Sequence, residues 1–205
     1  MKRAIFTFGR FNPPTVGHAM LIKKIEKLAQ KHGADGFVFT SSTQDKKKNP
    51  LTYKTKTRLL KKMTRKLTIV DNKEIRTPFE AFGYLDSVKY DHIIMVVGSD
   101  RVREFKTNIS KYIGTTYKNV KKFEVISAGQ RDPDAEGVEG MSASKVRAAA
   151  MSNEYDKFKM GFPDNIGERE TQNIYKEIQR VMGVNESNEN GWFSFDEYAE
   201  FLEDH

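Results

Sequence analysis

Ten residues near the N-terminus bring together side chains that bind phosphate groups. The stretch from Gly9 to His18 reads Gly-Arg-Phe-Asn-Pro-Pro-Thr-Val-Gly-His. Because Thr15 and His18 are three residues apart, both side chains can face one phosphate from the first turn of a helix. His18 can donate a hydrogen bond to a developing oxyanion, and Arg10 supplies permanent charge through a forked set of donors. Gly9 and Gly17 let a ligand approach the backbone closely. The stretch predicts a phosphate site; the alternative is a turn with a capping threonine and a surface histidine.

Two later segments carry groups that suit a nucleotide. Gly98-Ser99-Asp100 follows the apolar run 93–97, and a carboxylate at a strand end can accept hydrogen bonds from ribose hydroxyls. The alternative is an aspartate that caps the next helix, and the two roles are compatible. Ser142 precedes a run of strong helix formers in which Arg147 could balance the charge of a triphosphate. The alternative there is a capped, alanine-rich helix with surface charge.

The elements that must position these segments alternate between strand and helix. Short β-rich runs alternate with helical spacings, which is typical of βαβ units and a parallel sheet. Strands are expected at 3–8, 36–41, 93–97 and 123–127. Helices are expected at 16–32, through 59–63, at 78–90, around 102–105 and from 142. The predicted fold class is α/β, a Rossmann-like parallel sheet with helices on both faces, plus a helical C-terminal extension. Ligands of such a sheet bind at its carboxyl edge.

Length and composition exclude several classes of protein. The chain has 205 residues, a formal net charge of +7 and no cysteine. We expect a main domain at 1–162 and a helical extension with an acidic tail at 163–205. The lack of cysteine excludes disulfide scaffolds, zinc–thiolate sites and thiol nucleophiles. No uncharged apolar run approaches the roughly 20 residues of a membrane span, so we expect a soluble, cytoplasmic protein with no membrane partner. The sequence leaves open whether the protein is a homo-oligomer.

The three segments together resemble a known family. Gly-x-Phe-x-Pro-x-Thr-x-Gly-His resembles the signature of the nucleotidylyltransferase superfamily, and the segments at 98–100 and 141–147 resemble its later motifs, in the same order. The resemblance covers about residues 3–150 and implies transfer of a nucleoside monophosphate from a triphosphate, here ATP with Mg²⁺, to an acceptor. The implied catalytic residues are Thr15, His18, Arg10 and Arg147. The implied residues for binding the donor nucleotide are Gly9, Phe11, Gly17, Gly98, Asp100, Ser142 and Ser144. This chain has Met141 and Ser144 where the family usually has isoleucine and threonine, which changes fine positioning only.

The acceptor is indicated by a second resemblance. Four features are similar to segments of the archaeal type of nicotinamide mononucleotide adenylyltransferase. They are the arginine after the first glycine, Ser41-Ser42-Thr43-Gln44, Asn49-Pro50-Leu51-Thr52 and Arg58. This similarity implies that Ser42, Asn49 and Arg58 bind the acceptor, with Arg58 on its phosphate. The alternatives are activity like that of phosphopantetheine adenylyltransferases and cytidylyl transfer to small alcohols or phosphates.

A basic stretch supports a competing hypothesis. Residues 45–66 hold ten Lys or Arg and one acid, including the triplet Lys46–Lys48. The triplet could be a solvated face or an anion-binding lid. The stretch as a whole could instead belong to a non-catalytic module that binds nucleotides or nucleic acid. Such binding should weaken steeply with added salt.

The C-terminal tail contains a pattern of a different kind. Residues 186–197 match a calcium-binding EF-hand loop at several ligand positions, with glycine at the sixth. The candidate calcium ligands are Glu186, Asn188, Asn190 and Glu197. Glutamate replaces the usual aspartate at the first position, which should weaken binding. The alternative is an acidic turn between two helices.

Overall fold

The computed structural model describes residues 1–129 and 141–183. Over this range its sheet has five parallel strands in the order β3-β2-β1-β4-β5. Their bounds are β1 Arg3–Gly9, β2 Asp35–Thr40, β3 Thr68–Ile69, β4 His92–Val97 and β5 Lys122–Ser127. The expected Rossmann-like α/β fold is confirmed. The predicted calcium loop, Glu186 to Glu197, lies outside the described residues.

The order of the strands places two of the predicted segments side by side. The chain runs from β1 outward through β2 to β3, then returns to the other side of β1 with β4. β1 and β4 pair in register from Arg3 opposite His92 to Phe6 opposite Met95. Their carboxyl ends, Gly9 and Val97, therefore flank the point where the strand order reverses, and ligands of such sheets bind there.

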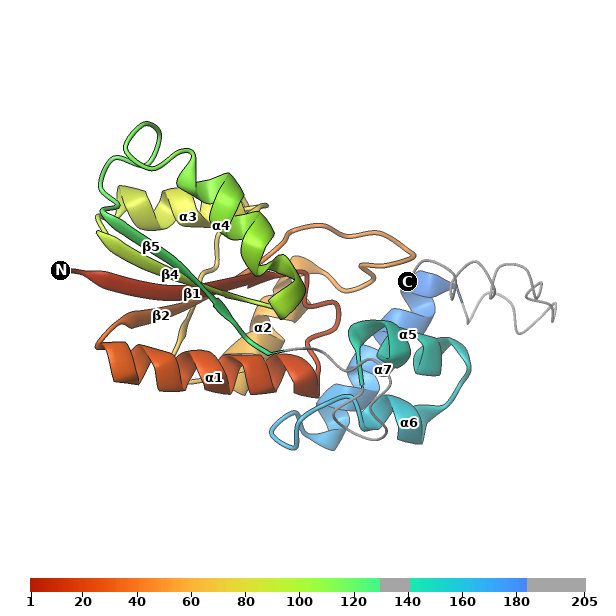
Figure 1. The fold of residues 1–205 in the computed structure, drawn as a ribbon. Coiled ribbons are helices and arrows are strands. Elements are labelled where there is room, and N and C mark those ends of the chain that lie inside the picture. The colour runs from red at the N-terminus through yellow and green to blue at the C-terminus, as the bar shows by residue number, and fades with distance from the viewer. Residues whose placement is uncertain (130–140, 184–205) are drawn as a thin grey trace.

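Helices cover both faces of the sheet. Figure 1 shows α1 on one face and α3 and α4 on the other. The bounds of the helices around the sheet are α1 Val16–His32, α2 Tyr53–Met63, α3 Pro78–Ser87 and α4 Val102–Ser110. α1 begins after Thr15 and ends at Gly33, which has the left-handed φ of +55° that glycine adopts without strain.

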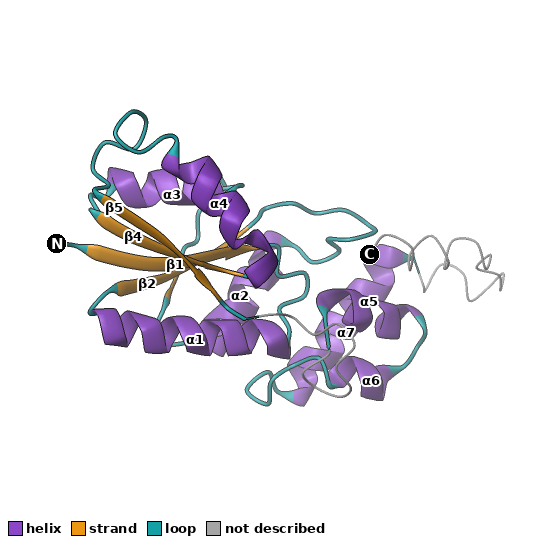
Figure 2. Cartoon of the chain, in the orientation of Figure 1, coloured by secondary structure: helices purple, strands orange, loops and turns teal. Residues whose placement is uncertain are grey.

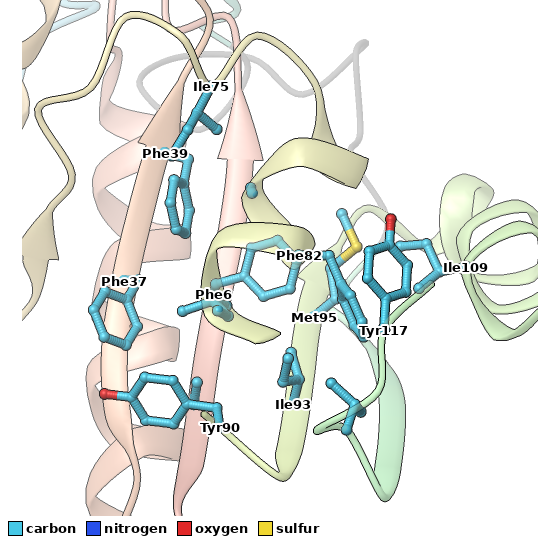
Figure 3. Close-up of a cluster of buried hydrophobic side chains, with 14 of the residues drawn as sticks. Phe6, Phe37, Phe39, Ile75, Phe82, Tyr90, Ile93, Met95, Ile109 and Tyr117 are labelled. Carbon is cyan, nitrogen blue, oxygen red and sulfur yellow. The ribbon is translucent and has the colours of Figure 1, made fainter. Parts of the chain in front are cut away.

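Two hydrophobic clusters fill the space between the sheet and these helices. Successive side chains of a strand point to opposite faces, so Phe6 packs on the α3 and α4 side and Ile5 on the α1 side. The first cluster is rich in aromatic side chains, and Figure 3 shows Phe6, Phe82 and Met95 within it. All six residues of β4 are buried, and the last five, 93–97, form the continuous apolar run that a strand covered on both faces needs.

A third cluster joins the C-terminal helices. α5 Ala143–Met151, α6 Tyr155–Lys159 and α7 Glu168–Met182 lie beyond the carboxyl ends of the strands (Figures 1 and 2). Ile174 and Ile178 of α7 share one core with Val146 of α5 and with Leu51 and Leu59. An amphipathic helix must bury its apolar face, and α7 buries it against the helix that carries the third motif. The expected boundary between 162 and 163 therefore falls within a shared core.

Some elements differ from the expected ones. β3 and α6 are additional, and α3 ends at Ser87, three residues before the expected end. Lys89 takes a left-handed φ of +64°, which turns the chain so that Tyr90 can donate from its hydroxyl to Asp35 at 2.7 Å. A short 3-10 turn, Ser99–Arg101, precedes α4. In the described part of the chain, no helix is both long and apolar enough to cross a membrane.

Candidate active site

The loop between β1 and α1 fixes the orientation of His18. The backbone N–H of Thr15 donates to Nδ1 of His18 at 3.0 Å, and the Thr15 hydroxyl lies 3.0 Å from the same nitrogen. A backbone N–H can only donate, so Nδ1 is the acceptor and the neutral ring carries its proton on Nε2. The first turn of α1 thus holds a histidine whose outer nitrogen is a hydrogen-bond donor.

Phe11 and Gly9 support this histidine from behind. The rings of Phe11 and His18 meet edge to face with centroids 4.8 Å apart, and Phe11 is 2% exposed. A Cβ at Gly9 would lie 2.8 Å from the Phe11 ring, so only glycine admits the ring there. Phe11 also holds a left-handed φ of +47°, which is costly for a bulky residue. The structure shows Gly9 and Phe11 as packing supports for His18, and their binding of the donor nucleotide stays a prediction.

Asn12 connects three segments that are distant in sequence. Its Oδ1 accepts from the backbone N–H of Leu51 at 2.9 Å, and its Nδ2 donates to the Leu51 carbonyl at 3.3 Å. Its own carbonyl accepts from Nη1 of Arg147 at 2.7 Å. The first motif is therefore joined to the loop before α2 and to the third motif through one buried asparagine.

Arg147 is held almost entirely inside the protein. It is 7% exposed, and besides Asn12 its Nη2 contacts Ser144 Oγ at 3.3 Å. Burial, followed by the nearby positive charge of Arg10, lowers the pKa of Arg147 to about 10, and Asp45 opposes this shift. Its Nε has no hydrogen-bond partner among the described residues. A buried guanidinium with an unfilled donor and no carboxylate bonded to it is suited to an anionic ligand.

The remaining motif residues lie at helix starts and strand ends. Ser142 is the N-cap of α5, and its Oγ accepts from the backbone N–H of Lys145 at 3.2 Å. Asp100 is exposed after β4, and its Oδ1 lies so close to Gly98 that a Cβ there would be 2.6 Å from it. Gly17 is exposed in the first turn of α1. The capping role is thus observed for Ser142. Asp100 lies just after β4, the strand beside β1. Among the described residues, no hydrogen bond or ion pair joins it to Thr15 or His18.

The tip of α1 has one partner that the sequence did not indicate. The first N–H of the helix, on Val16, donates to the carbonyl of Gly161 at 2.8 Å. This bond ties the loop between β1 and α1 to the segment after α6. It also uses one of the amides that the helix start could have offered to a phosphate.

The expected acceptor residues fall into two groups. Asn49 is 4% exposed and lines a pocket of about 540 Å³ together with Arg10, and Ser42 is half-buried just after β2. Arg58 points elsewhere, because its Nη2 pairs with Glu170 of α7 at 3.0 Å. Arg58 thus forms an ion pair with the C-terminal helix, and its contact with the acceptor's phosphate stays a prediction.

Lys56, two residues earlier, is the buried cation of α2. It is fully buried, and its Nζ donates to the carbonyl of Ser41 at 2.5 Å, at the end of β2. Burial lowers its pKa from the ordinary 10.5 to about 8. Sequence reasoning missed Lys56, although spacing could have indicated it. Tyr53, Lys56 and Leu60 lie three and four residues apart, which places the lysine on the apolar face of the helix.

Asn12→Ala should lower the free energy of unfolding by about 1–3 kcal/mol, because it leaves the buried backbone groups of Leu51 without partners. Urea denaturation would measure this loss. Asn173→Ala on the exposed face of α7 is the matched control and should change the stability by less than about 0.5 kcal/mol. Equal stabilities for the two variants would show that Asn12 does not join the loops.

The buried lysine predicts a pH-dependent stability. Between pH 8 and 10.5 the unfolded chain binds more protons at Lys56 than the folded protein, so stability rises with pH in this window. Across this pH window, the free energy of unfolding of the wild type should rise by up to roughly 3 kcal/mol more than that of Lys56→Met. Denaturation at about pH 7 and about pH 10 tests this, with exposed Lys54→Met as the control. If the wild type gained the same stability relative to Lys54→Met as it does relative to Lys56→Met, the pH dependence could not be assigned to Lys56.

Solved structures share this fold at low sequence identity. A Vibrio parahaemolyticus protein assigned as a nicotinate-nucleotide adenylyltransferase matches with a TM-score of 0.56 and 13% identity, over 85% of this chain and 99% of its own. The nicotinic acid mononucleotide adenylyltransferase of Plasmodium falciparum, complexed with NaAD, matches with a TM-score of 0.56 and 12% identity, over 90% of this chain and 98% of its own. Thermotoga maritima TmcAL, bound with alpha-thio ATP, matches with a TM-score of 0.52 and 12% identity, over 91% of this chain and 57% of its own.

None of the curated proteins matches the chain. The family model described as cytidylyltransferase-like matches residues 6–149, which begin within β1, include β2 through β5 and end near the end of α5. That range contains the loop around His18, the end of β4 and the helix of Arg147, in the order expected of nucleotidylyltransferases. The chain therefore belongs to the cytidylyltransferase-like family within the nucleotidylyltransferase superfamily.

Proposed function

We propose that the protein transfers AMP from ATP to a phosphate-bearing acceptor, nicotinamide mononucleotide, and releases pyrophosphate. The observation that carries the proposal is the pairing of Thr15 N–H with Nδ1 of His18. That bond leaves the protonated Nε2 as the donor at the positive end of α1, which suits an oxygen that gains negative charge. The similarity of the 41–52 segment to nicotinamide mononucleotide adenylyltransferases supports this acceptor. Two of the matched structures are named as adenylyltransferases of its nicotinate analogue, which supports the same class of acceptor.

The chemistry needs no nucleophile from the protein. An oxygen of the acceptor's phosphate attacks the α-phosphorus of ATP, a new P–O bond forms, and the bond to the β-phosphate oxygen breaks. Pyrophosphate leaves with the bonding electron pair. His18 would donate to a phosphate oxygen as charge develops, and the guanidinium groups of Arg10 and Arg147 would balance that charge. Catalysis is then positioning and electrostatic stabilisation.

Magnesium would enter with the nucleotide. In residues 1–129 and 141–183, no group of three or more His, Asp or Glu side chains could hold a metal ion. Mg²⁺ binds readily through substrate phosphates and one or two carboxylates, with water completing its shell. The exposed carboxylate of Asp100 is available for such a water-mediated contact or for a ribose hydroxyl.

A panel assay of pyrophosphate release tests the function. ATP and CTP would each be combined with nicotinamide mononucleotide, phosphopantetheine and a small phosphorylated alcohol. We expect turnover with ATP and nicotinamide mononucleotide, and a dinucleotide product. Turnover on another pair would refute the acceptor or donor but keep the reaction class. Nucleotide binding without turnover on any pair would refute the enzyme assignment.

The competing module that binds nucleic acid is less consistent with the charges of α2. Glu170 pairs with both Arg58 and Lys62, and Asp71 pairs with Lys61 at 3.1 Å. Three of the ten basic residues of the stretch are thus neutralised by the chain itself. Titration with RNA or DNA at low ionic strength should show no strong, salt-sensitive binding. Steep salt dependence would favour the competing hypothesis.

A further inference from the structure

The reaction described above leaves one buried cation without a role. Lys56 is fully buried in α2, and its Nζ donates to the carbonyl of Ser41 at 2.5 Å. Among the described residues, no ion pair involves Lys56. Burying an ammonium group without a counter-ion costs free energy, so stability alone does not account for a lysine at this position.

The charged groups around α2 have partners other than Lys56 or are exposed. The acids on the neighbouring elements each bind another residue, and they are Asp35 of β2, Asp71 beside β3, Glu168, Glu170 and Glu177 of α7, and Asp45 of the loop before α2. Tyr53, one turn earlier on the same face, donates its hydroxyl to the Val70 carbonyl at 3.2 Å. The neighbouring cations Lys54 and Arg58 are exposed. Burial is what lowers the pKa of Lys56 to about 8.

The carbonyl of Ser41 depends on this ammonium group. Ser41 is buried just after Thr40, the last residue of β2. No backbone N–H of the described residues donates to the Ser41 carbonyl. A buried carbonyl without a partner costs free energy comparable to that of a lost hydrogen bond. Lys56 supplies the missing donor from a position 15 residues further along the chain.

The anchored carbonyl lies at the start of the segment 41–44, which the sequence links to the acceptor. The N–H of Ser41 donates to the Gly9 carbonyl at 3.1 Å, at the end of β1. The backbone of Ser41 is thus held between β1 and α2. The next residue, Ser42, is half-buried and is the expected contact to the acceptor. Two hydrogen bonds to Ser41 therefore fix the start of this segment, and only the bond from Lys56 carries a charge.

We propose that Lys56 is a positioning residue for the acceptor: its ammonium group fixes the carbonyl of Ser41 and so holds Ser42 where it binds the acceptor. The identity of the ligand rests on the proposed function, whereas the anchoring of the segment 41–44 does not. A charged ammonium group binds a carbonyl more strongly than a neutral amine does. The anchor therefore weakens when Lys56 loses its proton.

Kinetics of Lys56→Met test the role. Methionine keeps the length and packing of the side chain but cannot donate to the Ser41 carbonyl. We expect KM for nicotinamide mononucleotide to rise about 10-fold, with kcat and KM for ATP changed by less than about 2-fold, because the lost charge-assisted bond positions only the acceptor. Lys54→Met, at an exposed position of the same helix, should behave as the wild type. A fall in kcat alone, or a rise in KM for ATP, would overturn the proposal.

The pH dependence of KM separates positioning by the charge from simple packing. Lys56 is about nine-tenths charged at about pH 7 and about nine-tenths neutral at about pH 9. KM of the wild type for the acceptor should therefore rise with pH toward the value of Lys56→Met. Dividing the KM of Lys56→Met by that of the wild type cancels the titration of other groups. A ratio that stays constant across this range would overturn the role of the charge.

Hydrogen exchange measures the anchor without turnover. Mass spectrometry of peptides that cover 41–44 would compare amide protection in the wild type, Lys56→Met and Lys54→Met. We expect protection to fall in Lys56→Met alone, since the segment loses its bond to α2. That loss in a protein without nucleotidyl transfer would keep the anchor and refute the proposed function. Unchanged protection in Lys56→Met, together with normal turnover, would keep the function and refute the anchor.

Discussion

His18→Ala should lower the turnover number at least ~100-fold, the scale on which enzymes lose rate when one oxyanion donor is removed. The ring of His18 is held by Thr15 on one side and Phe11 on another, so its Nε2 is already oriented before substrate arrives. Alanine removes that donor without changing the elements that carry the site. Steady-state kinetics with ATP and nicotinamide mononucleotide would measure the loss.

Two further variants separate the donor from its support. Asparagine can place an acceptor near the position of Nδ1, so His18→Asn should keep the bond from Thr15 N–H while removing the group that reaches the phosphate. It should therefore be as stable as the wild type and as slow as His18→Ala. Glutamine reaches farther and should recover part of the rate. His32→Ala, at the other end of α1, is the matched control. A near-normal rate for His18→Ala would remove this histidine from the mechanism.

Arg147→Ala should lose both rate and stability. The rate should fall about 100-fold, because a pre-positioned cation no longer balances the charge of the transferring phosphate. The free energy of unfolding should fall by about 1–3 kcal/mol, because the buried carbonyl of Asn12 loses its donor. Kinetics and urea denaturation measure the two effects on the same samples.

Arg147→Lys separates the contribution of the guanidinium's two hydrogen-bonding nitrogens from that of its positive charge. Lysine keeps the positive charge but cannot contact the Asn12 carbonyl and Ser144 Oγ with two separate nitrogens. We expect a rate between those of the wild type and the alanine variant. Arg169→Ala, at an exposed position at the start of α7, should behave as the wild type. A wild-type rate in Arg147→Ala would show that this guanidinium only braces the loop.

Local patterns predicted the fold because most elements have a local cause. α1 has its expected bounds, since Thr15 and Gly33 mark its ends chemically. The strand expected at 93–97 is observed from His92, one residue earlier. β3 was missed because its two residues are strand only through pairing with Phe37 and Val38, which no local pattern reveals.

In the candidate site, too, features with a local cause were predicted from the sequence and those that depend on distant contacts were not. The motif segments were found because their chemistry is contiguous in sequence. The bond between Asn12 and Leu51 was not found, because it joins residues 39 positions apart. Arg58 was matched by its type alone. It is two residues from Lys56, about 200° around the helix, so only one of them can face the sheet.

The central position of β1 has a consequence for synthesis of the chain. β1 leaves the ribosome first and can pair with β2 early, but its other neighbour begins only at His92. Until β4 has been translated, one long side of β1 keeps unsatisfied amides beside Ile5 and Phe6, and such an edge is a template for pairing with other chains. Newly made protein is therefore most prone to aggregate after β1 has been synthesised and before β4 has, and shielding by a chaperone matters most in that interval.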